Sequence, residues 1–363
     1  MLRLLISAGG TGGGVYPALA VIEALDHDFD VLWVGGIGGM EAELVHRAGL
    51  KYEAIPTAGL HGVGLKNIPG NMVKVMKGVK AARKILQEYN PDVLFFTGGY
   101  VGIPIALAGR SIPSLAYVPD IEPGLALKWI TRICTCTAVT APDSRVFFPD
   151  SATIIETGYP VRRELQLDKD EARSRFGLEN DRPVLLVFGG SRGARSINEA
   201  LWASLPELLV HIRIIHITGQ LDWPRVADVQ SGLGALAADY FPYAYLHERM
   251  PAALSAADLV VSRAGASILG EFTMLGLPSI LVPYPHAWRY QKVNADYLVR
   301  HGAALQIADE TLSESLPRTV LGLLGDPAGL KTMSDAARSM SMPEAAKQIA
   351  AELRLLAEGG RNG

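Results

Sequence analysis

The stretch from residue 260 to residue 295 holds side chains that could bind a phosphorylated ligand. An apolar run ends at Ser262 and is followed by a turn of small residues, Arg263-Ala-Gly-Ala-Ser267. A helix is expected to begin at this turn, and the free N–H groups and positive dipole end of a helix N-terminus attract phosphate. Glu271 falls about two turns into the same helix, where its carboxylate could accept hydrogen bonds from a ribose diol. An ordinary βαβ unit without a ligand accounts for the same pattern.

Two acidic residues, Asp120 and Glu122, lie in a loop that follows an apolar run over residues 114–118. If that run is a strand of a parallel sheet, the loop lies at its carboxyl end, where a carboxylate is well placed to take up a proton. Solvated loop acids without a catalytic role fit the same positions. His61, in a glycine-rich segment, likewise suits either contact with a substrate or exposure to solvent.

Two glycine-rich turns repeat one arrangement in the two halves of the chain. Gly9–Gly14 follows an apolar run over residues 2–8, and Gly189–Ala194 follows a run over residues 183–188. Each run is expected to be a buried parallel strand, and the glycines let the backbone pass close to a ligand above the strand's carboxyl end. The repeat predicts two Rossmann-like halves with facing parallel sheets and a ligand in the cleft between them.

The sequence argues against a nicotinamide or flavin cofactor. A dinucleotide-binding fingerprint places an acidic residue at the end of the second strand, about 20 residues after the glycine turn. Here the second strand, expected over residues 31–34, ends in Gly35 and Gly36.

Composition excludes several other classes of protein. A chain of 363 residues is long enough for two α/β domains, and a net charge of −3 argues against general nucleic-acid affinity. The apolar run over residues 2–8 is too short for a secretory signal, and no apolar stretch approaches the roughly 20 residues of a membrane-spanning helix. The two cysteines, Cys134 and Cys136, are too few for a disulfide scaffold or a metal site, and buried free thiols are expected.

Residues 65–89 are expected to form a basic, methionine-rich amphipathic helix. Such a segment can lie on an anionic membrane surface. A helix that packs on the core and exposes a solvated basic face fits the same pattern equally well. The basic residues are Lys66, Lys74, Lys77, Lys80, Arg83 and Lys84.

The chain is expected to divide near residue 160. Residues 1–160 are expected to form an N-terminal Rossmann-like domain, and residues 161–342 a C-terminal one. Further strands of the second sheet are expected over residues 212–218, 243–246 and 259–261. The segment 157–162 serves as the linker. A helix within residues 343–363 is expected to return to the first domain and complete it.

Four motifs, taken together and in order, resemble those of the GT-B glycosyltransferases, in particular the peptidoglycan N-acetylglucosaminyltransferases. They are Gly9-Gly-Thr-Gly-Gly13, Gly158-Tyr-Pro-Val-Arg162, Gly189-Gly-Ser-Arg-Gly-Ala194, and Arg263-Ala-Gly-Ala266 with Glu271, Gln291 and Asn294. The resemblance implies a metal-independent, inverting transfer of N-acetylglucosamine from UDP-N-acetylglucosamine, a substrate rather than a cofactor, to a lipid-linked muramyl-peptide acceptor. It also implies a peripheral protein on the cytoplasmic side of the cell membrane.

The resemblance further implies roles for individual donor-side residues. Arg162 and the turn at Ser191 meet the diphosphate, and Arg263 braces the pocket. Glu271 takes the ribose hydroxyls, the backbone at His247 takes the uracil edge, and Gln291 takes the sugar hydroxyls. The full donor-side set is Arg162, Gly190, Ser191, Arg192, His247, Arg263, Gly265, Ala266, Ser267, Glu271 and Gln291.

The acceptor side departs from the family pattern. Gly14 stands where the family usually has a histidine, and residues 117–120 read Tyr-Val-Pro-Asp in place of His-Glu-Gln-Asn. The second residue of the family's glutamine pair remains as Gln291, after Tyr290. Our hypothesis is that Asp120 is the catalytic base and that Glu122, His61 and Tyr100 line the acceptor side. The acceptor-side glycine turn comprises Gly10, Thr11, Gly12, Gly13 and Gly14.

Three alternatives to transfer onto the lipid-linked muramyl peptide remain open. The first keeps the fold and the donor but uses a different lipid or a small hydroxylated molecule as acceptor, which the changes at Gly14 and residues 117–120 favour. The second is a nucleotide-sugar binding protein with little catalysis. The third is a UDP-sugar epimerase, which would interconvert UDP-sugars without an acceptor.

Overall fold

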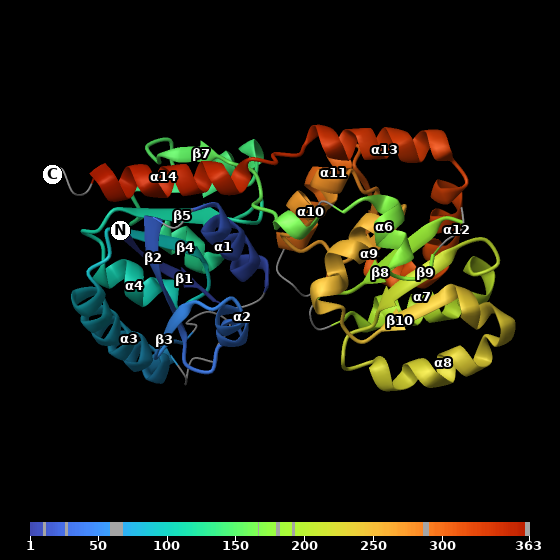
Figure 1. The fold of residues 1–363 in the computed structure, drawn as a ribbon, viewed down its shortest axis with the longest axis horizontal. Helices are drawn as coiled ribbons and strands as arrows, with labels where there is room; N and C mark the ends of the chain where they lie inside the picture. Colours follow the sequence, from blue (N-terminus) through green and yellow to red (C-terminus); the bar gives the residue numbers. More distant parts are fainter. Residues whose placement is uncertain are drawn as a thin grey trace. The chain divides into compact units, whose positions relative to one another are not determined.

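The chain folds into two compact units, each of which is described separately. One comprises Met1–Arg162 and Met342–Gly363, and the other comprises Arg163–Ser341 (Figure 1). The predicted site residues Gly10, Thr11, His61, Ser191 and Arg192 lie outside the described part of the chain. The computed structural model describes residues 1–9, 12–25, 28–58, 68–165, 167–178, 182–190, 193–285 and 290–359.

The first unit is built on a parallel sheet that has seven strands among the described residues, in the order β3-β2-β1-β4-β5-β6-β7. Its central strands are mostly apolar and buried over most of their length because helices cover both faces of the sheet. Leu4, Trp33 and Phe95 are completely buried in it. The strands are β1 (Leu2–Ala8), β2 (Phe29–Gly36), β3 (Lys51–Ile55), β4 (Val93–Gly98), β5 (Ser114–Val118), β6 (Cys136–Val139) and β7 (Ile154–Glu156).

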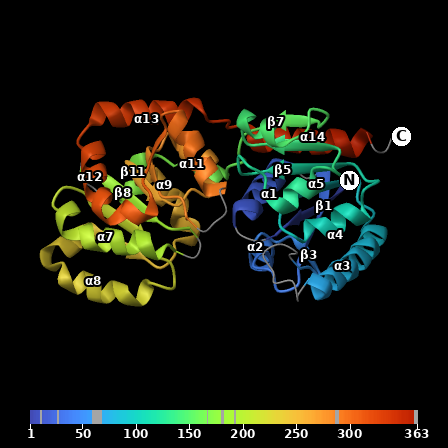
Figure 2. The same ribbon diagram turned by 180° about the vertical axis from the view of Figure 1, so that it is seen from behind.

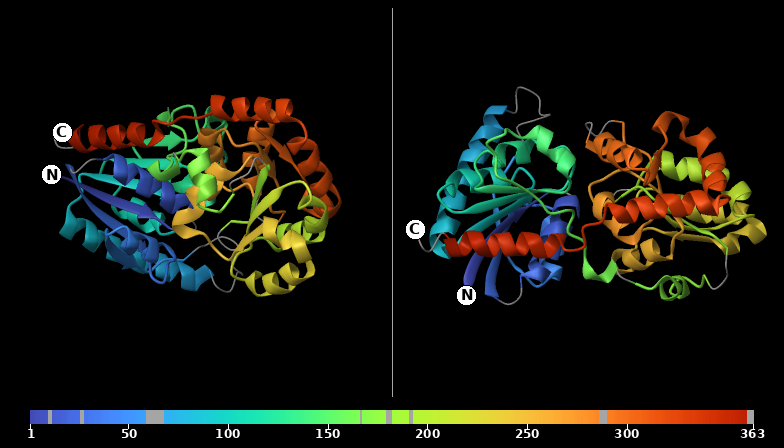
Figure 3. Two further views of the ribbon diagram at one scale, coloured as in Figure 1. Left: turned by 45° about the vertical axis from the view of Figure 1, so that its right-hand side comes forward. Right: turned by 90° about the horizontal axis from the view of Figure 1, so that it is seen from above.

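Helices α3, α4 and α5 pack in succession on one face of this sheet, and α1, α2 and α14 lie on the other (Figures 2 and 3). The buried side of α3 joins the core through Ala82, Ile85 and Leu86. The bounds are α1 (Gly12–Ala24), α2 (Glu41–Arg47), α3 (Ile68–Tyr89), α4 (Gly102–Ala108), α5 (Leu125–Ile130), η3 (Pro142–Phe147) and α14 (Ala345–Gly359).

The last helix, α14, belongs to the first unit. It packs along α1, and Arg354 near its end lies 3.2 Å from the Asp28 carboxylate. Cys136 Sγ contacts the Glu352 carboxylate at 3.8 Å. Both cysteines are free thiols, although Cys134 is only half-buried where the sequence predicted burial. Burial is the main cause that raises the pKa of each thiol to about 12.

The second unit contains a parallel sheet of six strands within the described ranges, in the order β10-β9-β8-β11-β12-β13. Its strands are β8 (Val184–Phe188), β9 (Arg213–Ile217), β10 (Tyr240–Tyr243), β11 (Leu259–Ser262), β12 (Ser279–Leu281) and β13 (Ala304–Gln306).

Helices and short 3₁₀ turns surround this second sheet (Figure 1). They bury an aliphatic core between α7, α12 and the strands. The bounds are η4 (Arg163–Leu165), α6 (Lys169–Ser174), α7 (Arg195–Leu208), η5 (Trp223–Arg225), α8 (Val226–Gly232), η6 (Gly234–Asp239), η7 (His247–Arg249), α9 (Met250–Ala256), α10 (Ile268–Leu275), α11 (Tyr290–Arg300), η8 (Asp309–Thr311), α12 (Leu312–Leu324) and α13 (Pro327–Ser339).

Both sheets follow the doubly wound strand order, which runs outward in opposite directions from the first strand of each unit. The order reverses between β1 and β4 in the first sheet and between β8 and β11 in the second. Ligands of open α/β sheets bind beside such reversal points, outside the carboxyl ends of the strands. The prediction of two Rossmann-like α/β domains with parallel sheets is therefore confirmed.

Two local predictions were wrong. A strand was expected over residues 243–246, but β10 comprises Tyr240–Tyr243 because those residues pair with β9, beginning with Tyr240 against Ile214. Glu271 was expected about two turns into its helix, but it lies in the first turn because the small residues before Ile268 stay outside the helix.

Candidate functional site

The turn after β8 depends on glycines that other residues could not replace without strain. Gly193 has φ of +77°, and a Cβ there would overlap the carbonyl oxygen of Thr218. A Cβ at Gly189 would overlap the backbone nitrogen of Ala194. Gly189 and Ala194, which flank β8 and α7 respectively, therefore lie in close backbone contact. Because Ala194 has no side-chain oxygen to cap α7, it leaves the first N–H groups of the helix to another acceptor, such as an anion.

Arg263 is the first residue of the turn after β11. It connects several segments at the carboxyl ends of the strands. Its guanidinium, 9% exposed, donates to the Asp309 carboxylate, to the Val282 carbonyl at 3.1 Å and to the Ser196 hydroxyl at 2.8 Å. It also lies 5.1 Å from the centre of the Tyr284 ring. Because Asp309 balances its charge, Arg263 acts as a brace between segments rather than as a free cation.

Two residues of α11 make similar connections. Asn294 is fully buried and donates from Nδ2 to the Ala264 carbonyl at 3.2 Å. Gln291 accepts the Tyr284 backbone N–H at Oε1, at 2.9 Å. The helix after β12 is thereby tied to the turn after β11 and to its own preceding loop.

The turn after β11 leads directly into α10. Gly265 and Ala266 form part of the turn, and Ser267 occupies the position before the helix. Glu271 is partly buried in the first turn of the helix, and its N–H bonds to the Ser267 carbonyl at 2.8 Å. The helix ends at Gly276, which has φ of +60°, as its sequence position predicts.

His247 has an unusual backbone conformation, with φ of +42°. Positive φ is costly for a residue with a side chain and is found mainly where function or surrounding contacts require it. The exposed His247 ring packs edge-on against Tyr245, with ring centres 4.5 Å apart and an angle of 62° between the ring planes. The following Arg249 lies over Phe176 at 4.5 Å and Tyr243 at 5.3 Å, which anchors the segment on both sides of the strained residue.

The glycine turns of the first unit contact each other at the reversal point of that sheet. Gly9 N–H donates to the Gly98 carbonyl at 3.3 Å, and a Cβ at Gly99 would lie 2.8 Å from the Gly9 backbone. The Thr97 hydroxyl donates to the Gly14 carbonyl at 2.6 Å. A Cβ at Gly14 would lie 3.2 Å from the Thr97 carbonyl oxygen, so a larger residue at this position would displace one of the turns.

The acidic residues after β5 occupy different environments. Asp120 is partly exposed, whereas Glu122 is 3% exposed and pairs with Lys128 at 2.9 Å. Tyr117 is fully buried and its hydroxyl lies 2.7 Å from the Thr140 hydroxyl. Burial raises the pKa of Tyr117 well above its usual value, and the Asp120 charge acts in the same direction. Tyr117 is therefore a neutral core residue and does not replace the family's histidine as a proton acceptor.

Arg162, the last residue of the first unit's main segment, stacks on an aromatic ring. Its guanidinium lies 4.5 Å from the centre of the Tyr16 ring in α1. Its Nε is buried and has no hydrogen-bond partner within the described part of the chain. Tyr100, in the turn after β4, is 38% exposed.

The structure brings together only part of the predicted donor set. Gly190, Arg263 and Gln291 follow β8, β11 and β12, which are neighbours in one sheet, whereas His247 follows the outer strand β10. Sequence reasoning missed Asp309, although a carboxylate close after the last strand of the sheet, β13, was the signal that could have identified it.

No cluster of three or more His, Cys, Asp or Glu side chains that could hold a metal ion occurs in the described ranges. In the first unit Arg162 lies over the Tyr16 ring, and in the second unit Arg263 lies over the Tyr284 ring. An anionic ligand of the second unit would meet the N-terminal N–H groups of α7.

Comparisons with known proteins agree with this architecture. The sequence matches the glycosyltransferase family 28 N-terminal domain over residues 4–139 and the family's C-terminal domain over residues 184–349. A Roseiflexus protein named UDP-N-acetylglucosamine--N-acetylmuramyl-(pentapeptide) pyrophosphoryl-undecaprenol N-acetylglucosamine transferase is 38% identical over 420 residues. The alignment covers 98% of this chain and 95% of the relative.

Solved structures show the same fold. The crystal structure of Acinetobacter baumannii MurG has a TM-score of 0.78 and 26% identity, over 98% of this chain and all of that one. A UDP-GlcNAc 2-epimerase from Neisseria meningitidis, bound to UDP-GlcNAc, has a TM-score of 0.69 at 14% identity, over 98% of this chain and all of that one. The second likeness shows a shared fold alone.

Proposed function

This chain belongs to glycosyltransferase family 28, and on that premise we propose that it transfers N-acetylglucosamine from UDP-N-acetylglucosamine to a lipid-linked muramyl-peptide acceptor. The observation that carries the proposal is the similarity, over 98% of the chain, to a transferase named for that reaction. Glycine turns at the reversal points of both sheets support it, since such turns receive phosphate and sugar groups closely.

On the donor side, we assign the diphosphate to the N-terminus of α7 and to Arg162. Their partial and full positive charges would offset the charge of the departing UDP. Glu271 would accept the ribose hydroxyls, and the strained backbone at His247 would bond the uracil edge. Because Gln291 Oε1 already accepts the Tyr284 N–H, its NH₂ group remains to donate to a sugar hydroxyl.

The proposed chemical step is an inverting displacement. The acceptor hydroxyl oxygen attacks the anomeric carbon of N-acetylglucosamine, the bond from that carbon to the UDP oxygen breaks, and UDP leaves with the electron pair. Asp120 takes the hydroxyl proton. We assign this role to Asp120 because it is partly exposed, whereas Glu122 is buried and paired with Lys128 of α5.

One observation favours a second candidate, a UDP-sugar transferase with another lipid or a small molecule as its acceptor. Position 14 is a glycine packed against Thr97, and Tyr117 is buried and bonded to Thr140. Neither can take a proton from an acceptor. The family pattern therefore changes at two positions, 14 and 117, from a residue that could accept this proton to one that cannot.

The proposed reaction is tested by incubating the full-length protein with UDP-N-acetylglucosamine and a soluble lipid I analogue while both product and UDP are measured. Product formation supports the proposal, and UDP binding without product favours the second candidate. Asp120→Asn should lower kcat by at least about a hundredfold with unchanged UDP affinity. Asp92→Asn is the control, since Asp92 accepts the Arg3 N–H at 2.7 Å at the opposite edge of the same sheet. Equal turnover of the two variants would contradict the assignment of the base.

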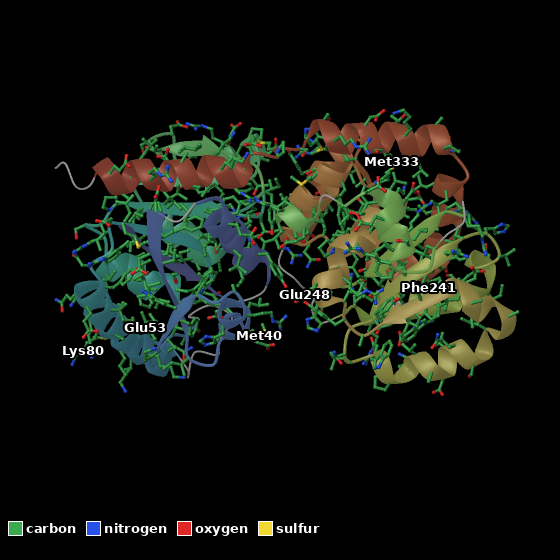
Figure 4. All side chains as sticks on the ribbon, in the orientation of Figure 1. Met40, Glu53, Lys80, Phe241, Glu248 and Met333 are labelled. Atoms are coloured by element: carbon green, nitrogen blue, oxygen red, sulfur yellow. The ribbon has the colours of Figure 1, made fainter. Side chains whose placement is uncertain are left out.

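We also propose that α3 contacts an anionic membrane surface. Met72, Val73 and Met76 are 53%, 51% and 68% exposed on a helix that carries five cations. Lys80, on the same helix, points away from the sheet (Figure 4). No helix within the described ranges has both the length and the apolar character needed to span a bilayer. A lipid-linked acceptor would be reached from such a surface.

Vesicle co-sedimentation tests this contact. Lys77→Glu with Lys80→Glu should weaken binding to vesicles containing anionic lipid roughly tenfold or more at low salt. Lys331→Glu with Lys347→Glu, at side chains 73% and 66% exposed on other helices, reverses the same charge elsewhere and should have little effect. Equal loss in the two double variants would point to net charge rather than to α3.

A further inference from the structure

A histidine in the middle of the second sheet has no place in the donor-side roles described above. His216, in β9, is completely buried. Its Nδ1 lies 2.8 Å from the Tyr240 hydroxyl and its Nε2 lies 3.0 Å from Asn198 Oδ1. Burial lowers the pKa of His216 to about 3, with the Asp222 charge acting in the opposite direction, so the ring is neutral near pH 7.

The Asn198 amide determines which ring nitrogen of His216 carries the proton. Its Nδ2 donates to the Thr218 carbonyl and to the Asp222 carboxylate, both at 2.9 Å. Both amide hydrogens are therefore used, and the reversed amide would place Oδ1 against two acceptor oxygens. Oδ1 must accept a hydrogen bond, so His216 is protonated at Nε2 and donates to it.

The other end of the network leads to the same assignment. With its proton at Nε2, His216 accepts the Tyr240 hydroxyl hydrogen at Nδ1. The Tyr240 oxygen in turn accepts the Trp202 indole N–H at 3.1 Å, and an indole nitrogen can only donate. Hydrogen bonds thus run in one direction from Trp202 to the Thr218 carbonyl, and each donor meets an acceptor.

This directed network ends at the glycine turn after β8. Asn198 lies in the first turn of α7, and its bond to Thr218 fixes that turn against the end of β9. Gly193 packs on the same Thr218 carbonyl so closely that no side chain would fit. The Thr218 N–H is held separately by the Tyr243 carbonyl at 3.0 Å. The position of the Thr218 carbonyl therefore sets the positions of Gly193 and of the first turn of α7.

We propose that His216 is a positioning residue for the donor diphosphate. Acting through Asn198, it orients the Thr218 carbonyl and with it Gly193 and the N-terminus of α7. The inference rests on the proposed function, which assigns that diphosphate to a UDP-sugar. A residue with a purely structural role would change stability without changing diphosphate affinity.

Two substitutions at one position separate these roles. His216→Gln places an amide donor where Nε2 was and keeps the bond to Asn198. His216→Asn places an acceptor where Nδ1 was, keeps the bond to Tyr240 and leaves Asn198 Oδ1 buried without a donor. Both remove one hydrogen bond and the ring, so their cost in thermal stability should be similar. UDP affinity is measured by calorimetry on the full chain, together with KM and kcat for UDP-N-acetylglucosamine.

We expect His216→Gln to bind UDP within about threefold of the unmodified protein and His216→Asn to bind about tenfold more weakly. KM for the UDP-sugar should rise in parallel, with kcat within about twofold, because the turn acts on binding in both ground and transition states. Equal UDP affinity in the two variants would overturn the inference.

Asn198→Leu provides a second measurement if His216→Asn does not fold, because it removes the donor to the Thr218 carbonyl through which His216 acts. UDP affinity should fall at least about threefold. In the control Tyr240→Phe, Asn198 Oδ1 still holds the ring proton at Nε2, so the bond to Thr218 remains and UDP affinity should stay within about twofold while stability falls. UDP affinity unchanged by Asn198→Leu would overturn the inference. UDP binding that is absent from the unmodified protein would overturn the proposed function as well, so the two failures are distinguishable.

Discussion

Removal of the Asp309 carboxylate should destabilise the second unit. It should also loosen the contacts by which Arg263 connects the donor-side segments. Asp309 is the anionic partner of Arg263, whose side chain is 9% exposed, and it also accepts the Ser196 hydroxyl at 2.8 Å. In Asp309→Ala the Arg263 guanidinium keeps the Val282 carbonyl and the Ser196 hydroxyl but loses its counter-charge. An arginine this deeply buried cannot recover that loss by hydration.

The expected magnitude follows from the burial of the pair. Breaking a buried ion pair by removing one partner costs about 3–5 kcal/mol, and the 19% exposure of Asp309 places this case near 3 kcal/mol. For a unit of this size such a loss lowers the midpoint of thermal unfolding by roughly 6–12 °C. Asp309→Asn keeps the hydrogen bonds but not the charge, so it should cost about 1–2 kcal/mol.

Calorimetric unfolding of the full chain checks this expectation, with UDP affinity measured in parallel. Asp335→Ala is the matched control, because it removes a carboxylate that is 54% exposed and pairs with Lys331 on the surface of the same unit. Its cost should be below about 0.5 kcal/mol. If Asp309→Ala lowered the unfolding midpoint no more than Asp335→Ala, the view of Arg263 as a charge-balanced brace would be refuted.

Three further predictions follow from other parts of the structure. Because the folded pKa of His216, about 3, lies below its unfolded value, the neutral histidine stabilises the fold above pH 6.5, and this contribution is lost as the pH falls toward 3. Urea unfolding between pH 7 and 4 should show a slope of up to about 1.4 kcal/mol per pH unit that His216→Gln flattens. Gly193→Ala should lower the free energy of unfolding by about 3 kcal/mol and abolish UDP binding. The control Gly177→Ala changes a glycine with φ of +68° that has no atoms near its added Cβ, so it should lower the free energy of unfolding by about 1 kcal/mol and leave UDP binding intact. Cys134 and Cys136, with pKa values raised to about 12, should react with iodoacetamide at pH 8 on the order of a thousandfold more slowly than in the unfolded chain, as followed by mass spectrometry.

The fold could be predicted from the sequence because its signals are local. Each central strand is a short apolar run followed by glycine or a small residue, and the repeat of strand, glycine turn and helix is visible at residues 2–14 and 183–194. The helix end at Gly276 follows from one residue type at one position. Boundaries such as that of β10 were less certain, since residues 240–246 are apolar or aromatic at most positions and only pairing with β9 selects the strand.

The candidate site could be predicted only in part, because its supporting contacts join residues far apart in the chain. Arg263 and Asp309 are 46 residues apart, and His216 and Tyr240 are 24 apart, and neither spacing has any periodic signal. Tyr117 shows a different limit of the family resemblance. The resemblance places this position at the acceptor, yet Tyr117 is buried with the other four residues of β5. The apolar residues of that strand were the sequence signal that predicted its burial.

The contacts around the donor-side and acceptor-side residues explain why substitutions on the two sides should differ in their effects. In the second unit, Arg263, Asn294 and Asn198 each tie one segment of the donor side to another through buried hydrogen bonds, so a change at any of them disturbs several segments. In the first unit, the partly exposed Asp120 stands at the edge of the core. Substitutions there can alter the acceptor without moving the nucleotide. Changes at residues 117–120 are therefore expected to leave UDP affinity intact, while Asn198→Leu should weaken it.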